Sequence, residues 1–138
     1  MPAKSTSGAA NAFGLFLLRL MVGWAFLSEG IQMVLHPAAL GAAKIGISAS
    51  HLIGLLVGIV EIVCGAMLIL GLATLYAIIP LLVVIGTTVA VTKIPLFYKQ
   101  RFWAALHESR TDLCMLLGLI AVACLGAGGF AVDRWRER

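Results

Sequence analysis

Two charged residues lie inside the first long apolar run of the chain, which extends from Gly14 to His36. These residues are Arg19 and Glu29. A charge at the centre of a bilayer costs roughly 2.5–3.5 kcal/mol even on lenient insertion scales, so it normally faces a protein interior, an opposite charge or water. We therefore expect other parts of the chain to contact both side chains.

A third charged residue, Glu61, lies near the centre of the apolar run from His51 to Leu72. About ten residues of helix, or roughly 15 Å, separate it from the nearest membrane surface. A carboxyl group at that depth has to be protonated, paired or hydrated, and such groups commonly mark ligand, proton or ion sites. Glu29 and Glu61 are therefore the candidate catalytic residues.

Helical spacing groups further polar residues with these acids, because residues three and four apart share a helix face. Gln32 shares the face of Glu29, and Cys64 shares the face of Glu61. Lys93 ends the third apolar run and His107 precedes the fourth, so both are expected on the same side of the membrane as Glu29. The candidate ligand-binding residues are Arg19, Glu29, Gln32, Glu61, Cys64, Lys93 and His107. For each charged residue the alternative is an internal salt bridge or a side chain that extends to the membrane surface.

Other kinds of chemistry have little support in the sequence. The histidines and cysteines do not show close metal-ligand spacing on one helix, so no metal site is expected. The three cysteines, Cys64, Cys114 and Cys124, are scattered through apolar runs, a pattern that does not indicate a disulfide framework. The glycine cluster at 126–129 lacks the preceding strand that a phosphate-binding loop requires, and it is typical of a helix end.

The composition places the chain in the membrane class. Of its 138 residues, 62% are hydrophobic and only 12% are charged, and the mean hydropathy is +1.07. An ordinary soluble domain has about 25% charged residues. The formal net charge of +4 favours attraction to anionic lipid headgroups over a nucleic-acid surface. The lipid bilayer is thus the expected partner, and nucleic-acid binding is not expected.

Four apolar runs are long enough to cross a bilayer, which takes about 20 helical residues. They predict an all-α integral membrane protein, an antiparallel four-helix transmembrane bundle with a single domain over 1–138. The predicted spans are 12–35, 51–72, 75–94 and 112–132. Residues 37–50 are expected to form a loop or a surface helix, and 95–111 a polar connection. Pro80 is expected to kink the third span.

Four spans place both termini on one side of the membrane. The basic residues are divided between the two sides, but Lys93 and Arg110 are candidate partners of buried acids and then do not count as loop charges. With these two set aside, both termini are expected in the cytoplasm and the protein in the inner (plasma) membrane. Gly54, Gly58 and Gly65 form a small-residue stripe suited to close helix packing, which leaves a homo-oligomer open.

Three stretches of the chain carry a family resemblance: LLRLMVGWAFLSEGIQMVLHP, VEIVCGAMLILGLAT and DLCMLLGLIAVACLGAGGFAVD. With them, the chain resembles the DoxX family of small four-span bacterial membrane proteins over nearly its whole length from Leu17 onward. The positions that match the family pattern are Arg19, Glu29-Gly30, Glu61 with Gly65 and Gly71, and Gly126, Gly128 and Asp133. Glu29 matches as a polar residue before glycine, but family members often have histidine at this position. Gln32-Met33 and Leu75 also stand where basic residues are common in the family.

The resemblance implies a membrane subunit of a redox system, with a quinone or similar apolar ligand as the candidate cofactor. In this interpretation Glu61 exchanges protons, and Lys93 or His107 donates a hydrogen bond to the ligand oxygen. Arg19 is then a structural partner in the other half of the bundle. A membrane or soluble redox protein is the candidate partner. Two alternatives remain open: a non-catalytic accessory subunit that anchors another protein, and a transporter of a small acid or ion.

Overall fold

The computed structural model describes residues 4–37, 39, 51–99 and 102–136. Throughout these residues the regular structure is helical and contains no strand, which confirms the predicted all-α class. The four long helices are α1 (Lys4–Leu35), α3 (His51–Leu70), α4 (Thr74–Thr88) and α6 (Phe102–Leu125). The shorter elements are the π-helix η1 (Val89–Lys93), α5 (Ile94–Lys99) and α7 (Val132–Arg136). Of the predicted connection 37–50, all but residues 37 and 39 lie outside the described part.

Three segments of the described chain are long and apolar enough to cross a membrane. They are Gly8–Leu35, His51–Leu70 and Thr74–Lys99. The fourth long helix, α6, has 24 residues, which is also sufficient length, but its first half carries Arg110 and Asp112. Large apolar side chains cover the outside of the helices, for example Trp24, Leu56 and Tyr76. A surface of this kind suits contact with lipid chains and not with water.

Glycines bring α1 and α3 into close contact. A Cβ atom on Gly30 would lie 2.7 Å from the carbonyl oxygen of Gly58, and one on Gly65 would lie 2.9 Å from the carbonyl oxygen of Gly23. A side chain at these positions does not fit, so the two backbones approach to a distance that only glycine permits. The glycine stripe predicted in the second span is therefore used inside the molecule, and it is not available for a dimer.

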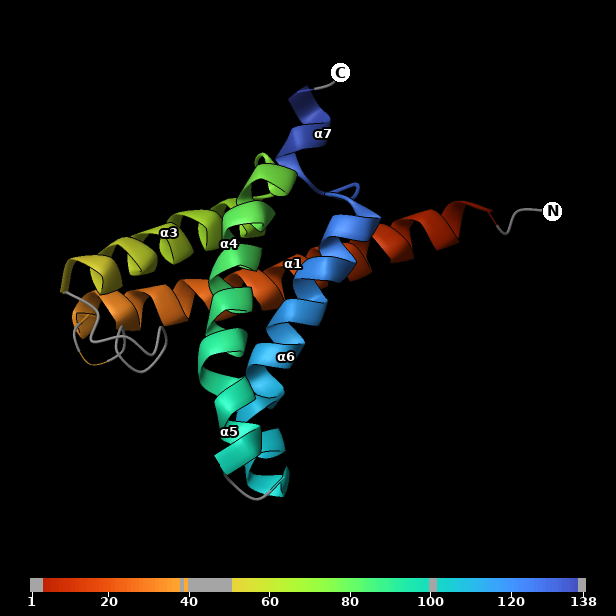
Figure 1. The fold of residues 1–138 in the computed structure, drawn as a ribbon. Helices are drawn as coiled ribbons and strands as arrows, with labels where there is room; N and C mark the ends of the chain where they lie inside the picture. The colour runs from red at the N-terminus through yellow and green to blue at the C-terminus, as the bar shows by residue number, and fades with distance from the viewer. Residues whose placement is uncertain (1–3, 38, 40–50, 100–101, 137–138) are drawn as a thin grey trace.

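The helices form two pairs that cross each other. Figure 1 shows α1 and α3 side by side and α4 and α6 as a second pair lying across them. The apolar core lies where the pairs meet and includes Val22, Phe26, Leu68, Leu81, Ile85, Leu119 and Val122. Each of these side chains is at most 1% exposed. The antiparallel helices of the predicted bundle thus pack as two crossed hairpins.

The connection predicted over 95–111 is largely helical, because α5 and the first turns of α6 occupy most of it. Pro95 does not end the third helix. It lies in the first turn of α5, where the missing N–H of proline is tolerated. Pro80 lies inside α4, and its kink stays a prediction. α6 ends at Leu125, directly before Gly126, whose φ of 78° is favourable only for glycine.

Candidate functional site

Glu61 lies in the interior, as its position in the sequence predicts. Its side chain is 0% exposed, on the face of α3 that also buries Gly58, Cys64, Gly65 and Leu68. A Cβ atom on Gly30 of α1 would lie 2.9 Å from the Cβ of Glu61. Because Gly30 has no side chain, α1 leaves room for the Cβ atom of Glu61 between the two helices.

The two other predicted residues on α1 near Glu61 differ in burial. Glu29 is half-buried and precedes Gly30, whereas Gln32 is exposed. Gln32 points outward because the buried stripe of α1 includes Phe26, Gly30 and Met33, which leaves the position before Met33 on the outer side of the helix. Of the two predicted residues on α1 near this end, only Glu29 therefore contributes to the interior.

His107 is also exposed, unlike its neighbours on the inner face of α6. That face buries Ala105, Asp112, Met115 and Leu119, and His107 does not fall on it. The structure thus does not bring His107 to Glu61. Cys64 is buried, and Cys114 and Cys124 are exposed free thiols. Among the described residues, no group of three or more histidine, cysteine or acidic side chains is arranged to hold a metal ion.

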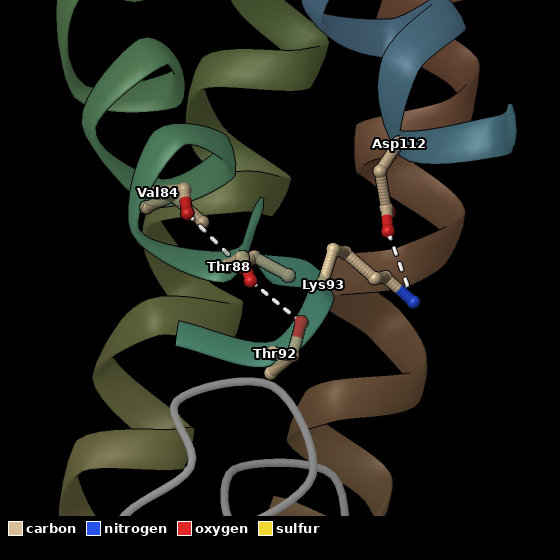
Figure 2. Close-up of polar contacts among 5 residues, drawn as sticks. All are labelled: Val84, Thr88, Thr92, Lys93 and Asp112. Carbon is tan, nitrogen blue, oxygen red and sulfur yellow. Dashed lines mark hydrogen bonds and ion pairs between the residues drawn. The ribbon is translucent and has the colours of Figure 1, made fainter. Parts of the chain in front are cut away.

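A salt bridge joins Lys93 to Asp112 at the end of the α4–α6 pair near α5. The distance between Lys93 Nζ and Asp112 Oδ2 is 3.3 Å, and the two side chains are 14% and 12% exposed (Figure 2). Lys93 is the last residue of the π-helix η1, a rare conformation that is frequent at functional sites. The contact joins the end of the third predicted span to the start of the fourth.

Two threonines, Thr88 just before the π-helix and Thr92 within it, donate hydrogen bonds to the backbone of the preceding turn. The Thr88 hydroxyl donates to the carbonyl oxygen of Val84 at 3.0 Å, and the Thr92 hydroxyl donates to the carbonyl oxygen of Thr88 (Figure 2). Hydroxyl groups that bond to the preceding turn satisfy themselves within an apolar helix and often bend it. Thr88 is only 5% exposed, so polar groups extend from the Lys93 end of the helix into the core.

Arg19 forms a separate polar centre near the turn between α3 and α4. Its side chain is 0% exposed. Its Nη2 donates to the carbonyl oxygen of Phe130 at 3.3 Å, and its charge interacts with that of Asp133. Nε and Nη1 of Arg19 have no hydrogen-bond partner within the described chain. The predicted assignment of Arg19 to the other half of the bundle agrees with these contacts.

Asp133 connects the end of the chain to the start of α4. Its Oδ1 accepts a hydrogen bond from the Ala73 N–H at 2.6 Å, and its Oδ2 accepts from the Thr74 N–H at 2.9 Å and the Thr74 hydroxyl at 3.2 Å. The Asp133 N–H donates to the carbonyl oxygen of Gly71 at 3.1 Å. Sequence reasoning singled out Asp133 only through the family resemblance. The local sequence gives no sign of this role, because the residue at the cap position of α4 is Ala73, whose side chain cannot cap a helix.

Two open hollows lie around the chain segments near Arg19. One, of about 410 Å³, is lined by Phe130, Ala131, Val132 and Trp135. The other, of about 650 Å³, is lined by Ala10, Asn11, Gly14, Leu15, Leu18 and Leu125. Both linings are mainly apolar. Neither of these two hollows is lined by Glu61 or Lys93.

Comparison with known proteins agrees with this membrane architecture. The model of the DoxX family matches residues 14–93, the part of the chain that runs from α1 through η1. The chain is also 42% identical over 126 residues to Uncharacterized membrane protein Rv3486 of Mycobacterium tuberculosis (strain ATCC 25618 / H37Rv), an alignment that covers 85% of this chain and 77% of the relative. No solved structure matches the chain. The chain is therefore a membrane protein that belongs to the DoxX family.

Proposed function

We propose that this protein is an integral subunit of a quinone-linked redox system in the inner membrane. It would bind an apolar, quinone-like ligand, with Glu61 as the group that exchanges protons with it. The observation that carries the proposal is the complete burial of Glu61 in the middle of an apolar helix. An ionisable group is costly at that depth, and membrane proteins commonly keep one there for proton or ligand chemistry. The redox part of the proposal follows the family resemblance.

The residues of this region have the chemistry that such a ligand requires. Conversion of a quinone to a quinol takes up electrons and protons in equal number, and the electrons would come from a partner redox protein. The Glu61 carboxyl group can hold a proton in the interior, and the half-buried Glu29 can pass one from the membrane surface. The Lys93 ammonium group, kept in place by Asp112, is the candidate donor to a ligand oxygen. His107 is exposed and has no part in this proposal.

The orientation of the chain is part of the same proposal. Both termini would lie in the cytoplasm; Lys93 supports this, because it is engaged with Asp112 and so does not count as a free loop charge, whereas Arg110 is exposed and gives no such support. This orientation does not depend on the side from which the redox partner contacts the protein. A cysteine-labelling experiment at residues near each terminus tests the orientation separately from ligand binding.

The test compares Glu61→Gln with Glu61→Asp in purified protein reconstituted in lipid. Binding of a short-chain ubiquinone analogue and proton uptake during its reduction by an added reductant are measured for both. We expect Glu61→Gln to lose proton uptake and at least tenfold in affinity, and Glu61→Asp to retain part of both. Size-exclusion elution identical to wild type controls for assembly. Unchanged binding and uptake in Glu61→Gln would remove Glu61 from the function.

A second candidate function is a non-catalytic subunit that anchors another protein. The observation that favours it is the position of the two apolar hollows, which lie beside Phe130, Trp135 and the first turns of α1 and not beside Glu61. A protein of this kind should purify from the native membrane with a partner in fixed proportion. Full ligand binding by the isolated protein would argue against it.

A further inference from the structure

We infer that the start of α4 and Arg19 together form a carboxylate-binding site, which Asp133 fills from within the same chain and which an external carboxylate can occupy in its place. The site lies near the α3–α4 turn and is independent of the proposed function of Glu61. It consists of donors that converge on one carboxylate, beside a buried positive charge. Its ligand class is a carboxylic acid, and the apolar surroundings favour one with an apolar tail.

The first observation is the arrangement of donors at the start of α4. The backbone N–H groups of Ala73 and Thr74 and the Thr74 hydroxyl all donate to the two oxygens of Asp133, at 2.6, 2.9 and 3.2 Å. α4 has 15 residues, so its free N–H groups and its dipole both favour a negative group at this end. The cap residue Ala73 provides no side-chain cap of its own, so these N–H groups are available to an acid from elsewhere in the chain or from outside.

The second observation is the unused donor capacity of Arg19. A guanidinium group has five N–H donors, yet Arg19 makes one described hydrogen bond, to Phe130, and its Nε and Nη1 have no partner in the described part of the molecule. The side chain is completely buried and its charge acts on Asp133. Nη1 lies against Gly71, where any Cβ atom would clash with it. The turn thus packs against the Arg19 guanidinium group, and Asp133 does not accept hydrogen bonds from its Nε and Nη1.

The third observation is the way in which Asp133 is attached. Residues 126–133, which we call the strap, comprise the link that follows α6 and the first two residues of α7. Gly126 and Gly128 in the strap have φ values of 78° and 77°, which permits sharp changes of chain direction. Polar contacts hold the strap from Phe130 to Arg19 and from Asp133 to the α3–α4 turn. Apolar contacts add to them, because the Phe130 ring meets that of Phe16 and Ala131 lies against Gly71. Phe130 and Val132 on either side of its buried Ala131 are exposed. A carboxylate that competes for the donors at Ala73 and Thr74 therefore competes for the hydrogen bonds of the Asp133 side chain, which hold one end of the strap.

The strap also provides an apolar surface for the tail of such an acid. The hollow of about 410 Å³ is lined by residues on both sides of Asp133, with little polar lining. A free inorganic anion would gain nothing from this surface, whereas a medium-chain carboxylic acid would bury its tail against it. For this reason we assign the site to carboxylates with an apolar tail and not to phosphate or sulfate.

The experiment uses the full chain in detergent, with acetate and octanoate as probes and chloride at equal ionic strength as the control. Asp133→Ala empties the site without changing the donors. We expect this variant to unfold at a lower temperature than wild type, and acetate and, more strongly, octanoate to restore much of the difference. The double variant Asp133→Ala with Thr74→Val, which lacks the hydroxyl donor, should regain less. If neither acid restores the melting temperature of Asp133→Ala, the site does not recognise an external carboxylate.

Displacement of the strap is measured on wild-type protein by hydrogen exchange. Octanoate should increase exchange in residues 126–133 while the amides of Ala73 and Thr74 stay protected, because one carboxylate replaces another. If octanoate rescues Asp133→Ala but exchange in the wild-type strap does not change, Asp133 is a permanent cap and the inference fails. If Asp133→Ala does not fold, the wild-type exchange measurement decides the outcome.

Discussion

The carboxylate of Asp133 accepts a 2.6 Å hydrogen bond from the backbone N–H of Ala73, a residue 60 positions earlier in the chain. Ala73 has a left-handed backbone conformation with φ of 44°, which costs about 1–2 kcal/mol for a residue other than glycine. The contact with Asp133 holds this turn in place and compensates for the cost. The order of the α3–α4 turn therefore depends on a residue that follows the last long helix.

Replacing Asp133 with asparagine should destabilise the protein moderately. The amide keeps one acceptor oxygen for α4 but removes the charge that acts on Arg19. Asparagine caps helices about as well as aspartate, so the expected loss is that of the charge at the helix N-terminus, about 0.3–1 kcal/mol, measured by chemical unfolding in detergent. Ala73→Gly, which relieves the left-handed conformation, should raise stability in the same assay. If Asp133→Asn were as stable as wild type, the charge of Asp133 would contribute nothing to stability.

Gly30→Ala should disrupt the contact between α1 and α3. The new methyl group would lie 2.7 Å from the Gly58 carbonyl oxygen and 2.9 Å from the Glu61 Cβ, and overpacking of this kind costs about 1–3 kcal/mol. Gly14→Ala on the same helix is the matched control, because nothing lies within 4 Å of its Cβ position. The melting temperatures of the two variants in one detergent give the comparison. Equal effects at both positions would contradict the close packing of the pair.

Lys93→Met should destabilise the α4–α6 pair by leaving Asp112 without its cation. Breaking a fully buried ion pair costs about 3–5 kcal/mol. We expect a smaller loss, because the two side chains remain 14% and 12% exposed. The double variant Lys93→Met with Asp112→Leu should recover most of the stability, since neither charge is then left alone. Additive losses in the double variant would show that the two residues do not interact.

Gly126→Ala and Gly86→Ala separate the effect of backbone conformation from that of packing. Nothing lies within 4 Å of either Cβ position, but only Gly126 has a positive φ, 78°. We expect Gly126→Ala to lose about 1–2 kcal/mol and Gly86→Ala, inside α4, to gain roughly 0.5–1 kcal/mol. Thermal unfolding of both variants tests the pair. A stable Gly126→Ala would indicate that the chain after α6 does not require a left-handed turn.

Local patterns in the sequence were sufficient to predict the helical membrane class and the burial of Glu61. An acid in the middle of an apolar run has no route to the surface, so its depth follows from helix length alone. The interior position of Arg19 followed for the same reason. Gln32 and His107 were placed inward by spacing, yet both are exposed, because spacing identifies the shared face of a helix but not which face meets its neighbours.

Contacts between distant segments were beyond the reach of the sequence. The cap on Thr74 comes from the far end of the chain, and the turn itself contains no acid that would signal it. The crossing of the two helix pairs was equally hidden, since apolar runs fix the length of a helix but not its angle to others. The extension of α6 back to Phe102 was missed because aromatic and charged residues there were interpreted as an interfacial connection.

The glycine contacts at Gly23, Gly30, Gly58 and Gly65 also have a mechanical consequence. Two backbones that touch without intervening side chains cannot slide past each other, because a shift of one residue would drive a side chain into a carbonyl group. We therefore expect α1 and α3 to move as one rigid unit, which includes Arg19, Glu29 and Glu61. A ligand that reaches Glu61 would therefore meet a rigid α1–α3 pair, and the packing that can give way to it lies at the core between this pair and α4 and α6.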